Sequence, residues 1–405
     1  MSVWEYILNL IPNLARNLRS AVEGAGWPEW LVFLVIGLTG VVAVTAFVML
    51  LGPPLTWVER RLVARAQVRI GPNRVGPFGL LQPVADALKL LSKEVIVPTQ
   101  ADGLLHLLAP AFIFTPAFMI FAVIPFAPGG VFTDLNMGLV YLIAVGSIGP
   151  ILVFTAGFAS ANRYSMLGAA RAVAQLVSYE VPVTVALATV AVAAGSLSLS
   201  DIVRSQSVPF ILMFPLAMII FLIGSFVEVN RSPADLAEAE SEIIAGYHTE
   251  YGGFKWAVFQ LAEYTHMIAA SAIIATLFLS GWKGPLLPPY LWFVVKTLGV
   301  VLVYMWVRFT LPRIRVDQLM GFAWKFLLPL SLINLMVVGL EVVLAPALPS
   351  WLMAINIPFA AASIVIWAKV YRAIEGPAKA TQRREIPGVT APLPAQEREA
   401  VGPVR

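Results

Sequence analysis

Seven carboxylates gather in one stretch of this chain, between residues 228 and 263. The 405-residue sequence has 23 acidic residues and a formal net charge of +4, and within this stretch only Arg231 and Lys255 carry positive charge. Carboxylates this close together repel one another, and when partly buried they titrate as a group over a range that reaches neutral pH. This arrangement favours proton transfer or the sensing of a nearby charge. The seven are Glu228, Asp235, Glu238, Glu240, Glu242, Glu250 and Glu263.

The middle of this stretch predicts a helix. Ser232 is a good N-cap and Pro233 suits the first helical position. A helix beginning there places Asp235, Glu238 and Glu242 near one face, where they are either a solvated acidic surface or a set of coupled groups in a partly buried site. Aromatic residues close the stretch, and they suit either an apolar ring ligand or a membrane-interface belt: Tyr251, Phe254 and Trp256.

The composition identifies the elements that must position these acids. Hydrophobic residues make up 59% of the chain and charged residues only 12%, against about 25% charged in a soluble domain. We therefore predict an all-α integral membrane protein with about nine transmembrane helices, each of about 20 apolar residues. The nine apolar segments lie at about 30–52, 104–127, 137–158, 174–195, 208–227, 256–281, 289–311, 326–346 and 351–370.

Cysteine is absent from the sequence, which excludes disulfides, thiolate metal sites and cysteine-ligated iron–sulfur clusters within this chain. The three histidines are dispersed, at positions 106, 248 and 266, so the sequence predicts no metal or haem site.

The basic residues predict the orientation in the membrane. Lysine and arginine concentrate in the odd-numbered connections between apolar segments, whereas the even-numbered ones contain only Arg204 and Lys283. We therefore expect the odd-numbered connections in the cytoplasm, the N-terminus outside and the C-terminal tail inside. The predicted organisation is an interfacial segment at 1–29, a transmembrane domain at 30–371 and a cytoplasmic tail at 372–405. The transmembrane domain includes a first cytoplasmic connection at 57–103 and an acidic connection at 228–255.

The first connection is too long for a simple turn, and two glycine–proline clusters divide it into two amphipathic pieces. The first piece, from Glu59 to Ile70, has three arginines along one face. These arginines either snorkel at a membrane interface or belong to a gate or headgroup site, with Glu59 and Arg60 at the mouth of a cavity. The three arginines are Arg61, Arg65 and Arg69.

Glu180 lies near the start of the fourth apolar segment. A carboxylate there must face protein or water, because burial against lipid costs about 3 kcal/mol on insertion scales. It is either an interfacial acid paired with Arg171 or Arg163, or a proton-relay acid. Lys296 and Glu341 lie within apolar segments and raise the same question.

Five sequence blocks, taken together, resemble one family: the membrane H subunits of NADH:quinone oxidoreductase, respiratory complex I. A ninth apolar segment followed by a tail is similar to the longer bacterial form of that family. One position departs from the family pattern, since Ala234 stands where phenylalanine is usual. The blocks are ERRLVARAQVRIGPNRVGPFGLLQPVADALKLLSKE, RAVAQLVSYEVP, EVNRSPADLAEAESEIIAGYHTEY, AEYTHM and PRIRVDQLMGFAWK.

The resemblance implies a subunit of the bacterial inner membrane that anchors the redox arm and forms much of the quinone chamber. Quinone, either ubiquinone or menaquinone, is then the substrate. No redox cofactor is held by this chain, and FMN and iron–sulfur clusters are expected in partner subunits. The expected partners are the other membrane and hydrophilic subunits, quinone and the lipid bilayer, with no nucleic acid.

Site residues follow from the resemblance by motif position. Those expected at the quinone tunnel or its junction with the redox arm are Glu59, Arg60, Arg69 and Asp86, with Arg231 in the adjoining acidic connection. Those expected to respond to quinone reduction are Asp235, Glu238, Glu240, Glu242 and Glu250. Those expected to continue the charge into the membrane, where quinol formation is coupled to proton translocation, are Glu180, Glu228 and Glu263.

Three other functions compete with this hypothesis. The first is the homologous membrane subunit of a membrane-bound hydrogenase or related respiratory dehydrogenase, which need not use quinone. The second is an independent ion transporter, and the third is a passive anchor for the redox arm.

Overall fold

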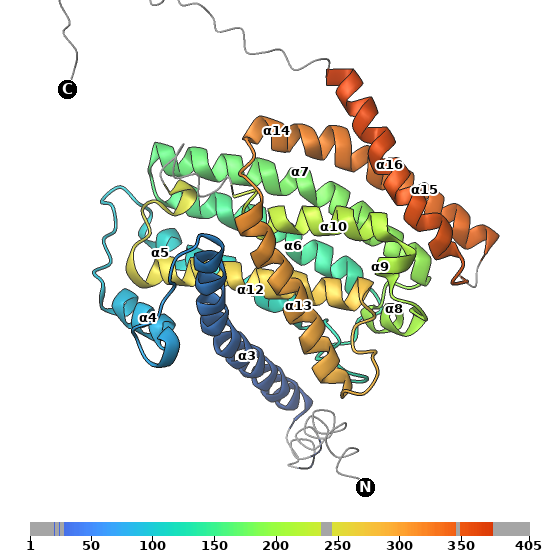
Figure 1. The fold of residues 1–405 in the computed structure, drawn as a ribbon. Coiled ribbons are helices and arrows are strands. Elements are labelled where there is room, and N and C mark those ends of the chain that lie inside the picture. The colour runs from blue at the N-terminus through green and yellow to red at the C-terminus, as the bar shows by residue number, and fades with distance from the viewer. Residues whose placement is uncertain (1–19, 21–23, 25–27, 236–244, 346–348, 376–405) are drawn as a thin grey trace, which may run out of the picture.

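Helices make up nearly all the regular structure in the computed structural model, which describes residues 20, 24, 28–235, 245–345 and 349–375 (Figure 1). No strand occurs in these ranges, only an isolated bridge between Ala127 and Gly130. The all-α prediction is therefore confirmed. The helices are α3 (Glu29–Ala66), η1 (Pro77–Gly79), α4 (Gln82–Ser92), α5 (Gly103–Phe121), α6 (Gly138–Ala159), α7 (Arg163–Ala194), α8 (Leu199–Ser205), α9 (Phe210–Met213), α10 (Pro215–Glu228), η2 (Gly246–His248), α12 (Gly253–Phe278), α13 (Pro289–Thr310), α14 (Val316–Gly321), the π-helical turn η3 (Phe322–Leu327), α15 (Leu328–Leu344) and α16 (Leu352–Glu375).

Eight helices in the described part of the chain are long and apolar enough to cross a membrane. All nine apolar segments of the sequence coincide with helix, but the segment at 208–227 is interrupted. There α9 ends at Met213 and α10 begins at Pro215, which has no backbone N–H to continue the helical hydrogen bonds. Because α10 has only 14 residues, the count of nine transmembrane helices stays a prediction.

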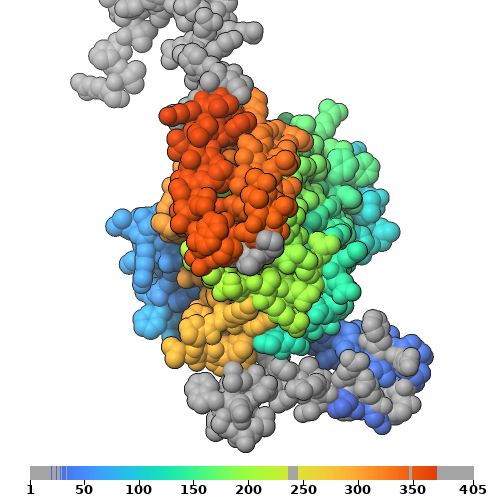
Figure 2. All heavy atoms as spheres, turned by 90° about the vertical axis from the view of Figure 1, so that its right-hand side faces the viewer, coloured from blue at the N-terminus to red at the C-terminus, as the bar shows by residue number. Residues whose placement is uncertain are grey.

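Two helices form the centre of the bundle. α7 packs against α6, α10 and α15, and α12 packs against α5 and α13. Within its most apolar window, 78% of α12 is buried, compared with 12% for α3 and 11% for α16. α3 and α16 are accordingly peripheral, and Figure 2 shows α16 and α15 over much of one face.

The first span continues farther than the sequence predicts. α3 runs without interruption through Pro53 and Pro54 to Ala66, so the prediction of a separate amphipathic helix from Glu59 to Ile70 was wrong. Tertiary packing explains the continuity, because Leu55, Glu59 and Ala64 are buried along this half of the helix. Arg69 lies beyond the end of α3, away from the helical face that it was expected to share with Arg61 and Arg65. One further α-helix, α4, follows the second glycine–proline cluster.

The predicted helix start at Ser232 and Pro233 was also wrong. Residues 231–235 form a turn with a cis Ser232–Pro233 peptide bond, and the Ala234 N–H donates to the Arg231 carbonyl at 3.0 Å. Tertiary contacts override the local capping preference. The Ile314 N–H donates to the Pro233 carbonyl at 3.2 Å, and Gln175 Nε2 donates to the carbonyl of buried Ala234 at 2.8 Å. Some predicted features lie outside the described residues: Glu238, Glu240 and Glu242, most of the interfacial segment at 1–29 and the tail from residue 376.

Candidate functional site

A buried charged cluster joins the first connection to the acidic connection. Glu59 of α3 is only 4% exposed, and its carboxylate accepts hydrogen bonds from Arg231 Nη1 at 3.0 Å and from the Tyr264 hydroxyl at 2.6 Å. Arg308 Nη1 is a third donor to the same carboxylate. The Arg231 guanidinium also stacks over the Tyr264 ring, 4.4 Å from its centre. We call Glu59, Arg231, Tyr264 and Arg308 the Glu59 cluster.

The Glu59 cluster connects four parts of the fold. Glu59 comes from α3, Arg231 from the turn after α10, Tyr264 from α12 and Arg308 from the last turn of α13. Arg231 is 5% exposed, so its pairing with Glu59 is shielded from water. Buried ion pairs are costly to form but much more costly to break, because the remaining charge then has no counter-charge. The Glu59 carboxylate therefore ties the start of the acidic connection to α3.

A second, more exposed ion pair links α3 to α4. Arg60 Nη1 donates to Asp86, which also accepts from Gln82 Nε2 at 3.2 Å and lies 3.7 Å from Lys89 Nζ. Partial burial raises the pKa of Asp86, but the hydrogen bonds from Arg60 and Gln82 and the two positive charges outweigh it. The pKa of this carboxyl is therefore below its usual range. Arg69 belongs to neither cluster and donates to Gln67 Oε1 at 2.7 Å.

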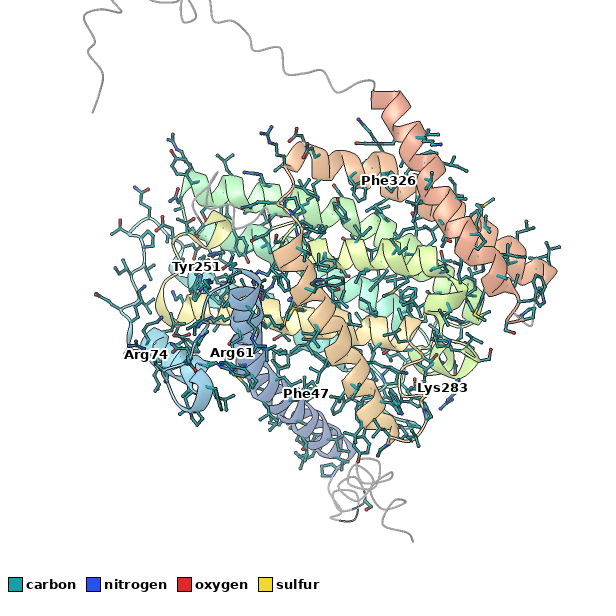
Figure 3. The ribbon with its side chains drawn as sticks, in the orientation of Figure 1. Phe47, Arg61, Arg74, Tyr251, Lys283 and Phe326 are labelled. Carbon is teal, nitrogen blue, oxygen red and sulfur yellow. The ribbon has the colours of Figure 1, made fainter. Side chains whose placement is uncertain are left out.

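Arg61, next along α3, faces the glycine–proline turn rather than the bundle core. Its guanidinium lies 5.0 Å from the centre of the Trp57 ring and 5.8 Å from that of Phe78 (Figure 3). Trp57 Nε1 donates to the Phe78 carbonyl at 3.2 Å. Three consecutive side chains of α3 therefore make different contacts. Glu59 points into the bundle, Arg60 holds α4 and Arg61 holds the turn.

The second half of the acidic connection packs tightly against the bundle. Tyr247, His248 and Tyr251 are buried, the Tyr251 hydroxyl donates to the Ala156 carbonyl at 3.0 Å, and Ser165 Oγ donates to the Tyr247 carbonyl at 2.7 Å. Burial lowers the pKa of His248 to about 4. It also raises the pKa of Tyr251 to about 12, against a smaller opposing effect of a hydrogen bond with Ser160. Both side chains are therefore uncharged at neutral pH.

A glycine permits this close packing. Gly246 has a φ of +62°, and a Cβ on Gly168 of α7 would lie 2.7 Å from the Gly246 Cα. The two backbones approach closely because neither has a side chain.

His106 of α5 fixes the end of the connection. Its buried ring stacks on Tyr251 with centroids 4.1 Å apart, and its Nδ1 lies 2.8 Å from Lys255 Nζ. Glu250 Oε1 accepts from Asn162 Nδ2 at 2.6 Å, beside a pocket of about 350 Å³ lined by residues 98–100 and 160–164.

Two of the acids expected within the membrane interact with each other. Glu180 of α7 accepts a hydrogen bond from Ser147 Oγ of α6, and its charge also acts on Glu228, the last residue of α10. Glu263 precedes Tyr264 of the Glu59 cluster on α12. Asp235 is half-buried, and its backbone carbonyl accepts from Arg313 Nη2.

Lys296 and Glu341, which also lie within apolar segments, have partners inside the bundle. Lys296 Nζ of α13 donates to three backbone carbonyls, those of Leu279 at 2.6 Å, Gly281 at 3.0 Å and Lys283 at 2.6 Å. Glu341 Oε2 of α15 accepts from Asn356 Nδ2 of α16 at 3.1 Å.

Sequence reasoning missed two members of the Glu59 cluster. Arg308 stands near the end of an apolar segment, where arginine commonly snorkels toward the interface. Tyr264 lies in the AEYTHM block, but a tyrosine in an apolar helix has no distinctive signal. A search for cations in the last turn of apolar segments would have selected Arg308.

The fold and this cluster define an all-α membrane protein with a buried ionic junction between its connections and its helices. A family model described as NADH dehydrogenase matches residues 38–339. The chain is 50% identical over 347 residues to a protein of Dehalococcoides mccartyi (strain CBDB1) that is named as the H subunit of NADH-quinone oxidoreductase. This match covers 85% of this chain and 96% of the relative.

Two other proteins that are also named as the H subunit of NADH-quinone oxidoreductase have a similar level of identity to this chain. The protein of Carboxydothermus hydrogenoformans is 46% identical over 336 residues, covering 82% of this chain and 96% of the relative. That of Thermomicrobium roseum is 46% identical over 332 residues, covering 77% of this chain and 97% of the relative. The chain belongs to the NADH dehydrogenase family, and the resemblance seen in the sequence is confirmed.

Proposed function

We propose that this chain is the quinone-binding, proton-coupling membrane subunit of a proton-translocating NADH:quinone oxidoreductase. It joins the hydrophilic redox arm to the membrane arm in the bacterial inner membrane, with the N-terminus outside and the tail in the cytoplasm. Its partners are the other subunits, quinone and lipid, and the FMN and iron–sulfur clusters belong to partner subunits. Family membership and the helical fold support this proposal.

The observation that carries the proposal is the buried pair of Glu59 and Arg231. Reduction of a quinone to a quinol adds two electrons and takes up two protons, so negative charge develops at the ring before protonation is complete. Charges act over longer distances in a low-dielectric interior than in water. A buried carboxylate held by two arginines therefore changes its pairing when such a charge forms nearby.

The pairing gives a route from the quinone to the acidic connection. Arg231 lies near the start of that connection, and a shift of its guanidinium away from Glu59 would move the turn that leads to Asp235. The acids that follow in the sequence, Glu238, Glu240 and Glu242, then change their proton affinity, because coupled carboxylates titrate together. The charge continues into the membrane through Glu228 and the nearby Glu180.

Two alternatives make different predictions. A subunit of a membrane-bound hydrogenase need not reduce quinone, and the names of the relatives favour the quinone enzyme. An independent transporter would move protons or sodium across liposomes as the purified chain alone, and the subunit we propose does not.

Glu59→Gln in the assembled complex tests the proposal. The amide keeps the size of the side chain but removes the charge that the two arginines share. We expect quinone reductase activity per assembled complex to fall by at least about tenfold, because hydrogen bonds to charged groups contribute about 1.5–3 kcal/mol. Electron transfer from NADH to an artificial acceptor that accepts electrons from the redox arm should remain normal.

The matched control is Asp201→Asn, which removes the charge of an exposed carboxylate 3.4 Å from Arg204. It should leave both activities unchanged. Full quinone reduction and full proton pumping in Glu59→Gln would support the passive anchor instead.

A further inference from the structure

A small cavity, lined by none of the residues of the Glu59 cluster, lies where three helical elements meet. It is enclosed by the break between α9 and α10 at Phe214 and Pro215, by α15 and by α16. The space in which the centre of a water molecule fits measures about 10 Å³, which is roughly enough for one water. Two side chains on its wall are polar, Asn334 of α15 and Asn356 of α16.

The orientation of Asn356 is fixed by its partners. Its Nδ2 donates to the Met213 carbonyl at 2.9 Å and to Glu341 Oε2 at 3.1 Å. Both partners are acceptors, so the amide nitrogen must face them and Oδ1 must face elsewhere. The residue is 4% exposed, and Oδ1 has no donor within hydrogen-bond distance among the described residues.

Asn334 presents the complementary group. It is 3% exposed, and its Nδ2 has no acceptor in the part of the chain that the structure describes. A buried donor and a buried acceptor therefore line one cavity of water size. Buried polar groups nearly always find a partner, and ordered water supplies it where protein does not.

We propose that this cavity binds one ordered water molecule, which accepts a hydrogen bond from Asn334 Nδ2 and donates one to Asn356 Oδ1. The water joins α16 to α15 at the break between α9 and α10. The family model ends at residue 339, so α16 lies beyond the matched range, and the water contacts α16 on one side and α15 on the other.

The role of the water bridge is structural, and it does not conduct protons. Hydrogen bonds extend from the water in one direction only, through Asn356 to Glu341. The other residues that line the cavity are apolar: Phe214, Pro215, Leu216, Val337, Val338 and Phe359. A proton reaching Asn334 from Glu341 has no further polar group of the cavity wall to move to. The bridge is therefore separate from the proposed coupling role.

A cryo-EM map of the assembled complex, at a resolution that shows other buried waters, tests the proposal. We expect a single round density about 2.7–3.2 Å from both Asn334 Nδ2 and Asn356 Oδ1. An empty cavity in such a map would overturn the proposal, as would direct contact between the two amides or a lipid chain in the cavity.

Two variants identify what holds the water. Asn334→Leu has a similar volume without a donor, and the density should disappear while α16 stays in place. Val337→Ala enlarges the same cavity but leaves both amides, and the density should remain. The opposite pattern would contradict the proposed ligands, and the map of the unmodified complex decides the matter even where a variant fails to assemble.

Discussion

Two cations of α13, one near each end, are held in opposite ways. Arg308, in the last turn, binds a carboxylate that also binds Arg231 and Tyr264. Lys296, nearer the start, binds three backbone carbonyls of residues that follow α12 and lies 5.8 Å from the centre of the Trp292 ring. One end therefore depends on the balance of side-chain charges drawn from four segments, and the other binds no charged side chain in these contacts.

Other side chains also bind backbone carbonyls at the Lys296 end. Gln206 Nε2 donates to the Thr276 and Leu277 carbonyls in the last turn of α12 at 3.2 and 2.9 Å, and Lys283 Nζ donates to the Arg204 and Gln206 carbonyls at the end of α8, both at 2.8 Å. Cations and donors at a helix C-terminus satisfy its free carbonyls and oppose its dipole. Figure 3 places Lys283 and Tyr251 at opposite ends of α12. Of the two cations, only Arg308 binds a side chain that can itself change charge. The Arg308 end of α13 is therefore the candidate for coupling to quinone reduction.

Of the substitutions that test this comparison, Glu59→Ala should have the largest effect on assembly of the complex. It leaves the guanidinium groups of Arg231 and Arg308 without their shared carboxylate, and breaking a buried ion pair costs about 3–5 kcal/mol. We expect the complex to assemble poorly, measured as the fraction of this subunit that co-purifies with the redox arm. Normal assembly and normal thermal stability would show that the Glu59 cluster contributes little.

Acid should weaken the packing of the acidic connection, because His248 is buried there. The pKa of His248 is about 4 in the folded chain, compared with an ordinary value of 6.5. As the pH decreases, the unfolded chain therefore binds a proton at His248 before the folded chain does. The contribution of neutral His248 to the free energy of unfolding is fully present above pH 6.5 and is lost as the pH falls toward 4. The difference of 2.5 pH units corresponds to about 3 kcal/mol.

The measurement is the midpoint of heat-induced dissociation at pH 7.5 and at pH 5. The midpoint should fall less for His248→Phe than for the unmodified complex, because phenylalanine has no proton to bind. An equal decrease of the midpoint in both would refute the assignment of acid sensitivity to His248.

Lys296→Met should have a smaller effect, and of a different kind. The carbonyls of Leu279, Gly281 and Lys283 lose their donor, but no buried charge is left without a counter-charge and water replaces part of the lost hydrogen bonds, so we expect a total cost of about 1–3 kcal/mol. We expect a lower midpoint of heat-induced dissociation but unchanged quinone reductase activity per assembled complex. A loss of activity without a loss of stability would remove the distinction between the two ends.

The sequence supports the fold better than the site. Composition alone leads to the all-α membrane class, and every apolar segment proved to be helical. Glu59 and Arg231 were both candidates by motif position, but they are 172 residues apart, and spacing predicts contacts only within an element. Ser232 has the local features of an N-cap, yet contacts of Pro233 and Ala234 with distant segments hold it in a turn. Such long-range contacts have no local signal.

A structure of the assembled complex with quinone bound tests the central claim most directly. We predict that the quinone ring lies between the first connection and the turn at Arg231–Asp235, with the Glu59 cluster beside it. We also predict that the distance between Arg231 and Glu59 differs between the quinone-bound and quinol-bound states. A ring bound away from both connections, with the Glu59 cluster identical in the two states, would contradict the proposed coupling.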